Sequence, residues 1–542
     1  MERQRQQRAQ QWSARLTNNA LAPFNARVQL ISAAALSLAV SILFLTTTSI
    51  GIGILPDSVA YMQIGSARHF APLYTWLLKG ATLAQIELTA AAWLLNWILY
   101  VVNAVLILRL LSLGTLSPIW AFLGTVLIVG HPVFVEYHSI AMTEPLFIAL
   151  VLTAAFAFLR AVQDNRGSGL ALVGAVIGLG MLTRFAAAPL LPTLATIRLL
   201  AGGGNLAKRT IDCAMMVCGC AIVFGSWLIA SELTSGQSTG RSLEFRGDPD
   251  TEYWLRTIVS AATMLLPSAL GPAIRILFLA LVSGAFVIIA VNYAHAWLRL
   301  SPVRRAQPQV LVPVVFGLLS LFYAIFLVVS VMIQYRLNLT GRFLLPLYVF
   351  LVLAAITPFG AGNLGFMRRR ELGTVLAALA LVIGASNLVR TAVFTVSTHS
   401  SGQGYAHKVW STSPVLAAAA KLPAGAAIYS NAPDLVEFRL GRSAAYIPAR
   451  FNHLSGRDDS PVPFAHQVNA MRRRLAQGNA YVVFIYGVDW RDYLISENAL
   501  LLSVPLVEEA TLPDGRVYRG ANKVTDVPVL QRSASSTLNE DM

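Results

Sequence analysis

VQLISAAALSLAVSILFLTTTSIGIGILPD, residues 28–57, is the stretch that decides the fold. No charged side chain interrupts it between Arg27 and Asp57. A run of about 20 apolar residues is long enough for a helix to cross the hydrocarbon core of a bilayer. Ten further apolar runs follow, and the fifth and sixth of the whole set are short and meet at Arg184. The sequence therefore predicts an α-helical polytopic membrane protein with about eleven transmembrane helices, at roughly 28–54, 89–112, 118–136, 144–162, 168–184, 186–201, 210–232, 273–297, 309–333, 343–360 and 373–392.

The composition agrees with this class. Of the 542 residues, 56% are hydrophobic and only 12% are charged, about half the charged fraction of a soluble domain. This excludes an ordinary cytosolic enzyme, and 25 Phe and 10 Trp exclude a disordered chain. The three cysteines fall in one apolar run, where we interpret them as small packing residues and not as a disulfide framework or a metal site.

The formal net charge of +15 reflects topology, so we predict no nucleic-acid partner. Basic residues occupy every second loop, as the positive-inside rule requires for a cytoplasmic N-terminus. We predict a multi-pass protein of the plasma (inner) membrane with external loops at 55–88 and 233–272 and an external C-terminus. The basic positions are Arg3, Arg5, Arg8, Arg15, Arg27, Arg109, Arg160, Arg166, Arg198, Lys208, Arg209, Arg299, Arg304, Arg305, Arg368, Arg369 and Arg370.

Three domains follow: a basic cytoplasmic tail (1–27), a transmembrane domain (28–392) and an external C-terminal α/β domain (393–542). The last segment has no run long enough to span a membrane. Its apolar stretches AAIYSN (426–431) and AYVVFIYG (480–487) predict strands, and residues 413–422 and 463–477 predict helices. Asp514-Gly515 predicts a hairpin turn. We interpret Asn431, Asp434 and Glu437 as turn and helix-cap residues.

The first external loop, LPDSVAYMQIGSARHFAPLYTWLLKG (55–80), combines an acid at the membrane surface with bases and aromatic residues. Asp57 is a candidate general base. Tyr61 and Lys79 are candidates for a phosphate-binding group beside it, and His69 and Tyr74 are further candidate contacts in this loop. The alternative is purely structural, because an acid here can also begin a helix over residues 59–67.

A second carboxylate, Glu144, stands before Pro145 at the external end of the fourth apolar run. Acid and proline are both favoured at a helix N-terminus, so the pair alone does not indicate a site. Nearby Tyr137 and His138 share that interface and are candidate acceptor contacts. No spacing of His, Cys or carboxylates marks a metal site, and we predict none.

Three arginines lie where short external loops should avoid them: Arg184, Arg336 and Arg342. A charged group near hydrocarbon usually has a partner. The partner of these arginines would be either an acidic loop residue or an anionic lipid head group.

As an ordered set, these motifs resemble the bacterial multi-pass glycosyltransferases of the GT-C superfamily, relatives of the protein O-mannosyltransferases and the lipid A aminoarabinose transferase. The resemblance is carried by PDSVAYMQIG…APLYTWLL, HP…EYHSIAMTEPLF, GLGMLTRFAAAPLLP and GRFLLPLYVFL, and in the tail by GQGYAHKVWSTSP…LPAGAAIYSNAPDLVEFRLGR. One position departs from the family pattern: many members have paired acids in the first loop, but here Ser58 follows Asp57.

The resemblance implies an inverting transfer of a sugar from a polyprenyl-phosphate donor to an external acceptor, which is a glycolipid, polysaccharide or protein. Asp57 would act as base, with Glu144 as the second carboxylate. Arg342, assisted by Arg184 or Arg336, would hold the lipid phosphate. No cofactor would be required, since arginines can stabilise a monophosphate leaving group. The alternatives are a glycan polymerase or ligase with a pyrophosphate-linked donor, a transporter or flippase for lipid-linked glycans, and a structural scaffold.

Overall fold

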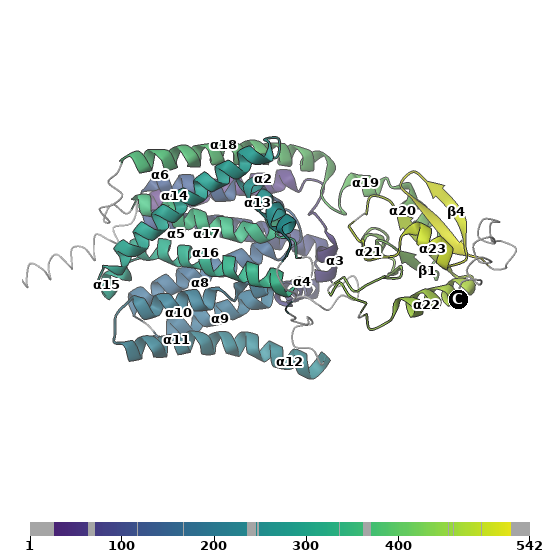
Figure 1. The fold of residues 1–542 in the computed structure, drawn as a ribbon, viewed down its shortest axis with the longest axis horizontal. Helices are drawn as coiled ribbons and strands as arrows, with labels where there is room; N and C mark the ends of the chain where they lie inside the picture. The colour runs from purple at the N-terminus through teal and green to yellow at the C-terminus, as the bar shows by residue number, and fades with distance from the viewer. Residues whose placement is uncertain are drawn as a thin grey trace, which may run out of the picture.

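A computed structural model of the chain describes residues 26–62, 71–115, 117–165, 167–235, 245, 249–334, 337–360, 370–453, 455–458, 460–488 and 490–521. A bundle of long helices makes up one part, and a small sheet domain lies beyond one end of it (Figure 1). The short helices α3 (Pro56–Tyr61) and α4 (Leu73–Leu83) lie at the end of the bundle next to the sheet domain, and α15 (Pro302–Arg305) lies at the opposite end (Figure 1).

Each predicted apolar run contains a helix within the described residues. In the described part of the chain, eight helices are long and apolar enough to cross a membrane, and a ninth span results if α6 and α7, bent by 61°, count as one. Two shorter apolar helices make up the rest of the predicted set, so the count of eleven crossings stays a prediction. The helices are α2 (Ala26–Thr47), α5 (Leu88–Thr115), α6 (Pro118–Val129), α7 (Pro132–His138), α8 (Glu144–Asp164), α9 (Gly167–Thr183), η1 (Phe185–Ala187), α10 (Leu190–Leu200), α11 (Leu206–Cys220), η2 (Ala221–Gly225), α12 (Ser226–Ser235), α14 (Pro272–Leu298), α16 (Pro308–Ile333), α17 (Gly341–Gly360) and α18 (Arg370–Ser401).

Two helix ends differ from the sequence-based boundaries. The first helix ends at Thr47 and not at 54, because residues 53 and 54 leave the helix to form isolated bridges with residues 140 and 404. The last membrane helix continues to Ser401 and not to 392. Its final turns are held against α2, since Ser49 donates to the carbonyl of His399 at 2.9 Å. The sheet domain therefore begins after residue 401.

The segment 233–272 contains a helix that the sequence analysis did not predict, α13 (Thr251–Leu265). The Asp250 side chain caps it by accepting from the backbone N–H of Tyr253 at 2.7 Å. At its other end, His131 and Arg390 both contact the carbonyl of Met264, at 2.8 and 2.9 Å. This helix is therefore fixed to the bundle.

The sheet domain holds a five-stranded mixed sheet in the order β2-β1-β3-β5-β4. Strands β1 (Ala427–Ser430), β2 (Ala444–Tyr446) and β3 (Ala480–Ile485) are parallel, and β4 (Leu506–Leu512) and β5 (Gly515–Gly520) add as an antiparallel hairpin. The predicted strands, the hairpin turn and the helices α20 (Pro414–Ala420) and α22 (Phe464–Ala476) are present. Strand β2 and helices α19 (Lys408–Ser411), α21 (Pro433–Leu440) and α23 (Glu497–Ser503) were not predicted.

The loop before α3, the loop before α8 and the sheet domain are joined through their backbones. Gly53 pairs with Ile140 and Ile54 pairs with Gly404 in isolated bridges. A Cβ at Gly404 would stand 2.1 Å from the Ile54 carbonyl oxygen, at a φ of +55°, so only glycine fits there. The Gln403 side chain donates a hydrogen bond to Ser139 Oγ at 2.9 Å. The GQGY segment thus fixes these two loops and the sheet domain to one another.

Candidate active site

Helix α3 places Asp57 at the end of the bundle next to the sheet domain (Figure 1). Leu55 precedes the helix, Pro56 occupies its first position, and Ser58 Oγ accepts from the Leu55 backbone N–H at 3.0 Å. Ser58 therefore does the capping, and the Asp57 carboxylate is available for other contacts. The Ser58 side chain is fully buried, 3.8 Å from the sulfur of Met142. A second acid at that position would lie buried against a thioether, which accounts for the departure from the paired-acid pattern.

Arg342, in the first turn of α17, joins the two carboxylates. Its Nη1 donates to Asp57 Oδ2 at 2.5 Å and its Nε donates to Glu144 Oε1 at 2.5 Å. Its Nη2 donates to the Tyr61 hydroxyl at 3.2 Å. The planar guanidinium thus uses three nitrogens on three partners, a geometry that the single ammonium of lysine lacks.

Arg184 lies between α9 and η1 and supplies the second cation. It donates to the same Glu144 Oε1 and to Thr143 Oγ1. Its guanidinium carbon is 5.6 Å from the ring centre of Phe343, and that of Arg342 is 5.9 Å from the same ring. The two guanidiniums therefore share one carboxylate and one aromatic ring.

The two carboxylates differ in how much of each side chain is exposed to solvent. The Glu144 side chain is 1% exposed, whereas that of Asp57 is 32% exposed. Arg184 and Arg342 are 14% and 22% exposed. Asp57 and the two arginines can thus meet a substrate from outside, while Glu144 lies beneath them. Its second oxygen, Oε2, has no hydrogen-bond partner among the described residues.

Tyr61 of α3 and Tyr74 of α4 extend the site along the segment between α2 and α5. Their rings meet edge to face with centres 5.7 Å apart. Tyr74 is fully buried, and its hydroxyl donates to Asn96 Oδ1 at 3.3 Å. Burial raises the pKa of Tyr61, and the neighbouring Asp57 and Glu144 act in the same direction against Arg342. The Tyr61 hydroxyl therefore stays protonated at neutral pH.

The remaining predicted residues take different positions. Tyr137 is half-buried and near enough to sense the charges of Glu144, Arg342 and Arg184. His138 is fully buried, with Nδ1 2.7 Å from the Phe134 carbonyl, which is a packing position and not a surface one. Lys79 is exposed on α4. Predicted residues His69 and Arg336 lie outside the described part of the chain.

Sequence reasoning missed Thr143, Phe343 and Gln403 as neighbours of the site. Thr143 and Phe343 are each adjacent in sequence to a predicted residue, which is the signal that would have found them. Gln403 lies in a quoted motif, but nothing in its type indicated a contact with the second loop.

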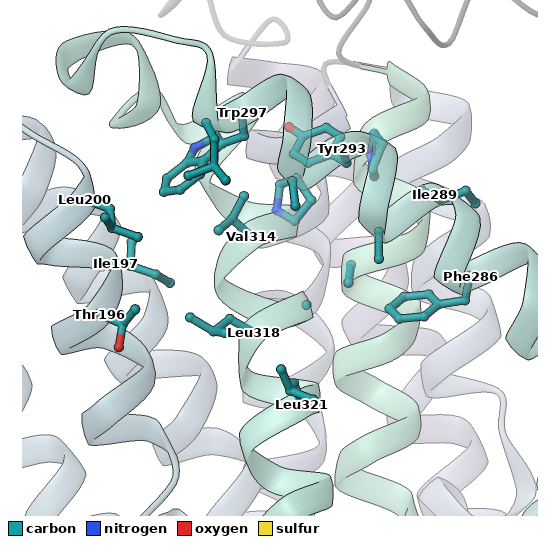
Figure 2. Close-up of a pocket in the computed structure, with 17 residues that line it drawn as sticks. Thr196, Ile197, Leu200, Phe286, Ile289, Tyr293, Trp297, Val314, Leu318 and Leu321 are labelled. Atoms are coloured by element: carbon teal, nitrogen blue, oxygen red, sulfur yellow. The ribbon is translucent and has the colours of Figure 1, made fainter.

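A cavity of about 340 Å³ lies elsewhere in the bundle, between α10, α14, α16 and α17. Apolar side chains such as Phe286, Ile289, Leu318 and Leu321 surround most of it, with Tyr293 and Trp297 at one end (Figure 2). Its lining lies toward the α15 end of these helices and contains no charged residue, so this cavity suits hydrocarbon and not a phosphate. Within the described residues, no three His, Cys, Asp or Glu side chains gather as a metal site would require.

Residues 69–229 match the family described as dolichyl-phosphate-mannose-protein mannosyltransferase. The fold is similar to ArnT from Cupriavidus metallidurans bound to undecaprenyl phosphate: 13% identity, 92% of this chain and 99% of that chain covered, TM-score 0.55. The apo state of the same protein gives 12% identity, coverage of 93% and 99%, and a TM-score of 0.56. Arabinofuranosyltransferase AftD from Mycobacteria gives 14% identity and a TM-score of 0.48 over 92% of this chain and 40% of that one. No curated protein matches the chain in sequence. The expected resemblance to GT-C glycosyltransferases is confirmed, and the chain has their fold.

Proposed function

We propose that this protein is a membrane glycosyltransferase that moves a sugar from a polyprenyl-phosphate donor to an extracytoplasmic acceptor. One observation carries the proposal: Arg342 holds the exposed Asp57 and the buried Glu144 at the same time, at 2.5 Å each. The family matched by residues 69–229 and the likeness to ArnT with its bound undecaprenyl phosphate support the same reaction class.

The donor phosphate would bind at Arg342 and Arg184. Both guanidiniums are partly exposed, and both lie over Phe343. Arginine binds phosphate oxygens through paired N–H donors, and a fixed cation at the leaving oxygen stabilises the charge that develops there. Because arginines can supply this stabilisation, we propose that the reaction needs no cofactor.

Asp57 would act as the base once the phosphate has arrived. In the structure its Oδ2 is bound by Arg342, and a phosphate on Arg342 would compete for the same N–H. The displaced carboxylate would then take the proton of an acceptor hydroxyl. The hydroxyl oxygen forms the new bond to the anomeric carbon, the bond from that carbon to the phosphate oxygen breaks, and the polyprenyl phosphate leaves from the opposite face with inversion.

Glu144 takes a positioning role in this mechanism and not a catalytic one. Its side chain is 1% exposed and lies under the two arginines that it binds. A carboxylate buried in that place cannot reach an acceptor, but it fixes both cations in one orientation. The chain therefore works with one exposed acid.

The topology of the proposal follows from the charges of the loops. We infer from the arginine-rich turns on the α15 side that this end is cytoplasmic and that the cluster and the sheet domain lie outside. Nucleotide sugars are cytoplasmic, so an external transferase in the inner membrane needs a lipid-borne donor.

Purified full-length protein in nanodiscs tests the reaction. Radiolabelled polyprenyl-phosphate and polyprenyl-pyrophosphate sugars are offered one at a time with envelope lipids and glycans as acceptors, and release of the lipid carrier is followed with and without EDTA. The variant is Asp57→Asn. The matched control is Asp164→Asn, an exposed acid at the opposite end of α8.

We expect one donor to turn over in wild type and in the control, EDTA to have no effect, and Asp57→Asn to lose turnover. Binding of unlabelled polyprenyl phosphate should persist in Asp57→Asn, because both arginines remain. Turnover that survives in Asp57→Asn would reject Asp57 as base. Consumption of only pyrophosphate-linked donors would favour the polymerase or ligase alternative, and binding of lipid-linked glycans without any transfer would favour a flippase.

A further inference from the structure

The carboxyl ends of the three parallel strands lie at one edge of the sheet. Strand β1 ends at Ser430, β2 ends at Tyr446, and β3 ends at Ile485. In sheets with parallel strands, ligands bind in the crevice outside these ends. The residues that follow β1 and β3 are therefore the place to look for a second site.

A buried ion pair stands at this edge. Arg491 Nη2 donates to Asp434 Oδ2 at 2.6 Å, and its Nη1 donates to the Asn431 carbonyl at 2.8 Å. The Tyr405 hydroxyl donates to the same Asp434 oxygen at 2.8 Å. Asp434 and Arg491 are each 8% exposed. Within the described chain, Asp434 Oδ1 has no hydrogen-bond partner and is itself buried, so the carboxylate lies beneath the surface of this edge.

Two exposed aromatic rings lie close to the arginine of that ion pair. The guanidinium carbon of Arg491 is 5.3 Å from the ring centre of Tyr446 and 5.9 Å from that of Trp490. Tyr446 is nevertheless 48% exposed and Trp490 54% exposed. One buried cation thus holds both rings in place while leaving much of each ring open to solvent.

This edge is also tied to the loop that carries Asp57. The backbone N–H of Tyr405 donates to the Ile54 carbonyl at 2.7 Å, two residues before α3 begins. Leu435 and Val436 of α21 share one buried core with Val59 and Met62. A ligand held at the edge would therefore lie on the domain face that is built onto the catalytic loop.

We propose that Tyr446 and Trp490 form a carbohydrate-binding platform that holds the glycan part of the acceptor, which makes the acceptor a glycan-bearing molecule. This inference rests on the proposed transfer reaction. The C–H face of a sugar ring stacks on an aromatic ring, and Tyr446 and Trp490 present two half-exposed rings beside the loop that carries Asp57. In a protein that transfers a sugar to an acceptor, a pair of rings in this place suits a sugar unit of that acceptor.

The test uses full-length protein in nanodiscs on an array of immobilised bacterial envelope oligosaccharides, with no donor present. The variants are Trp490→Ala, Tyr446→Ala and Trp490→Phe. The control is Tyr486→Ala, because this exposed ring packs near Phe484 and its hydroxyl contacts Glu497. The thermal midpoint of each variant reports folding, and Trp490→Phe keeps a ring if the alanine variant is unstable.

We expect wild type and Tyr486→Ala to bind at least one glycan. Each of Trp490→Ala and Tyr446→Ala should weaken that binding by about tenfold, and Trp490→Phe should weaken it less. The platform is overturned if both alanine variants bind glycans as well as wild type does, or if wild type binds no glycan.

Measuring donor turnover together with glycan binding distinguishes a failure of the platform from a failure of the proposed reaction. If the platform is correct and the transferase reaction is wrong, glycan binding depends on Trp490 but no polyprenyl-phosphate donor is consumed. If the reaction is correct and the platform is wrong, the donor is consumed and the KM for acceptor is the same in wild type and Trp490→Ala.

Discussion

Replacing Glu144 with Gln should destabilise the protein more than any other single change in the charged cluster. Glu144 is 1% exposed and binds both Arg342 and Arg184. Removing one partner of a buried ion pair costs about 3–5 kcal/mol, because the remaining charges are left without compensation. Arg342 would keep Asp57 and Tyr61, and an amide oxygen would remain as an acceptor, so we expect a loss of about 3 kcal/mol, at the lower end of that range.

The comparison variant is Asp57→Asn, which removes a carboxylate from the same Arg342. Asp57 is 32% exposed, and solvent-exposed ion pairs contribute about 0–1 kcal/mol. We therefore expect Asp57→Asn to cost about 1 kcal/mol or less. Glu252→Gln is a control for charge removal alone, because its pair with Arg256 is largely exposed, at 73% and 71%.

Thermal unfolding of the purified variants in one detergent, followed by tryptophan fluorescence, ranks the three changes. Glu144→Gln should unfold at a clearly lower temperature than wild type, Asp57→Asn close to wild type, and Glu252→Gln at the wild-type temperature. The reasoning would be refuted if Glu144→Gln matched Asp57→Asn. That result would mean that Glu144 is not buried beneath the arginines, and its assignment as a positioning residue would then fail.

Three further changes test single contacts. Arg342→Lys should lower turnover by about a hundredfold or more, because one ammonium cannot replace three directed N–H donors; steady-state kcat and KM measure this, and wild-type turnover would contradict the assignment. Tyr61→Phe should cost about 1 kcal/mol in chemical denaturation. The loss should be equal at about pH 6 and about pH 9, because burial raises the pKa of Tyr61 and its hydroxyl stays protonated; a loss that disappeared at the higher pH would show that Tyr61 ionises. Gly404→Ala should loosen the sheet domain, because the new Cβ would clash with the Ile54 carbonyl, whereas Gly425→Ala meets nothing within 4 Å. Limited proteolysis after α18 should cut Gly404→Ala faster than Gly425→Ala, and equal rates would contradict the clash.

Much of the fold could be predicted because its physical signals are local. Apolar runs of about 20 residues indicate membrane helices without knowledge of their neighbours, and all the predicted runs are helical. The hairpin at Asp514-Gly515 was predicted by turn chemistry, and the structure pairs Leu512 with Gly515. Strand β2 was missed because it is three residues long and mostly exposed, so it carries no apolar pattern. Helix α13 was missed because residues 233–272 were interpreted as one loop.

The site could be predicted only as a set of residues at one membrane face. Four segments far apart in sequence supply Asp57, Glu144, Arg184 and Arg342. The alternation of loop charge predicts that all four lie on one side of the membrane, and the structure brings their side chains together. Their roles depended on contacts that no pattern contains. The order of burial is the clearest case, because sequence cannot tell that Glu144 lies under the arginines while Asp57 lies beside them.

Close packing of backbones explains how these charges come to meet. Ion pairs act strongly only over a few ångströms, so attraction between side chains cannot by itself align loops that are hundreds of residues apart. The backbone bridges of Gly53 with Ile140 and of Gly404 with Ile54 bring the loop before α3, the loop before α8 and the sheet domain together. Both bridges need glycine, since a Cβ at Gly53 would lie 2.9 Å from an Ile140 side-chain carbon. The charged cluster therefore depends on two uncharged residues, and the same contacts that bring the loop of Asp57 against the loop of Glu144 also attach the aromatic edge of the sheet domain to the catalytic loop.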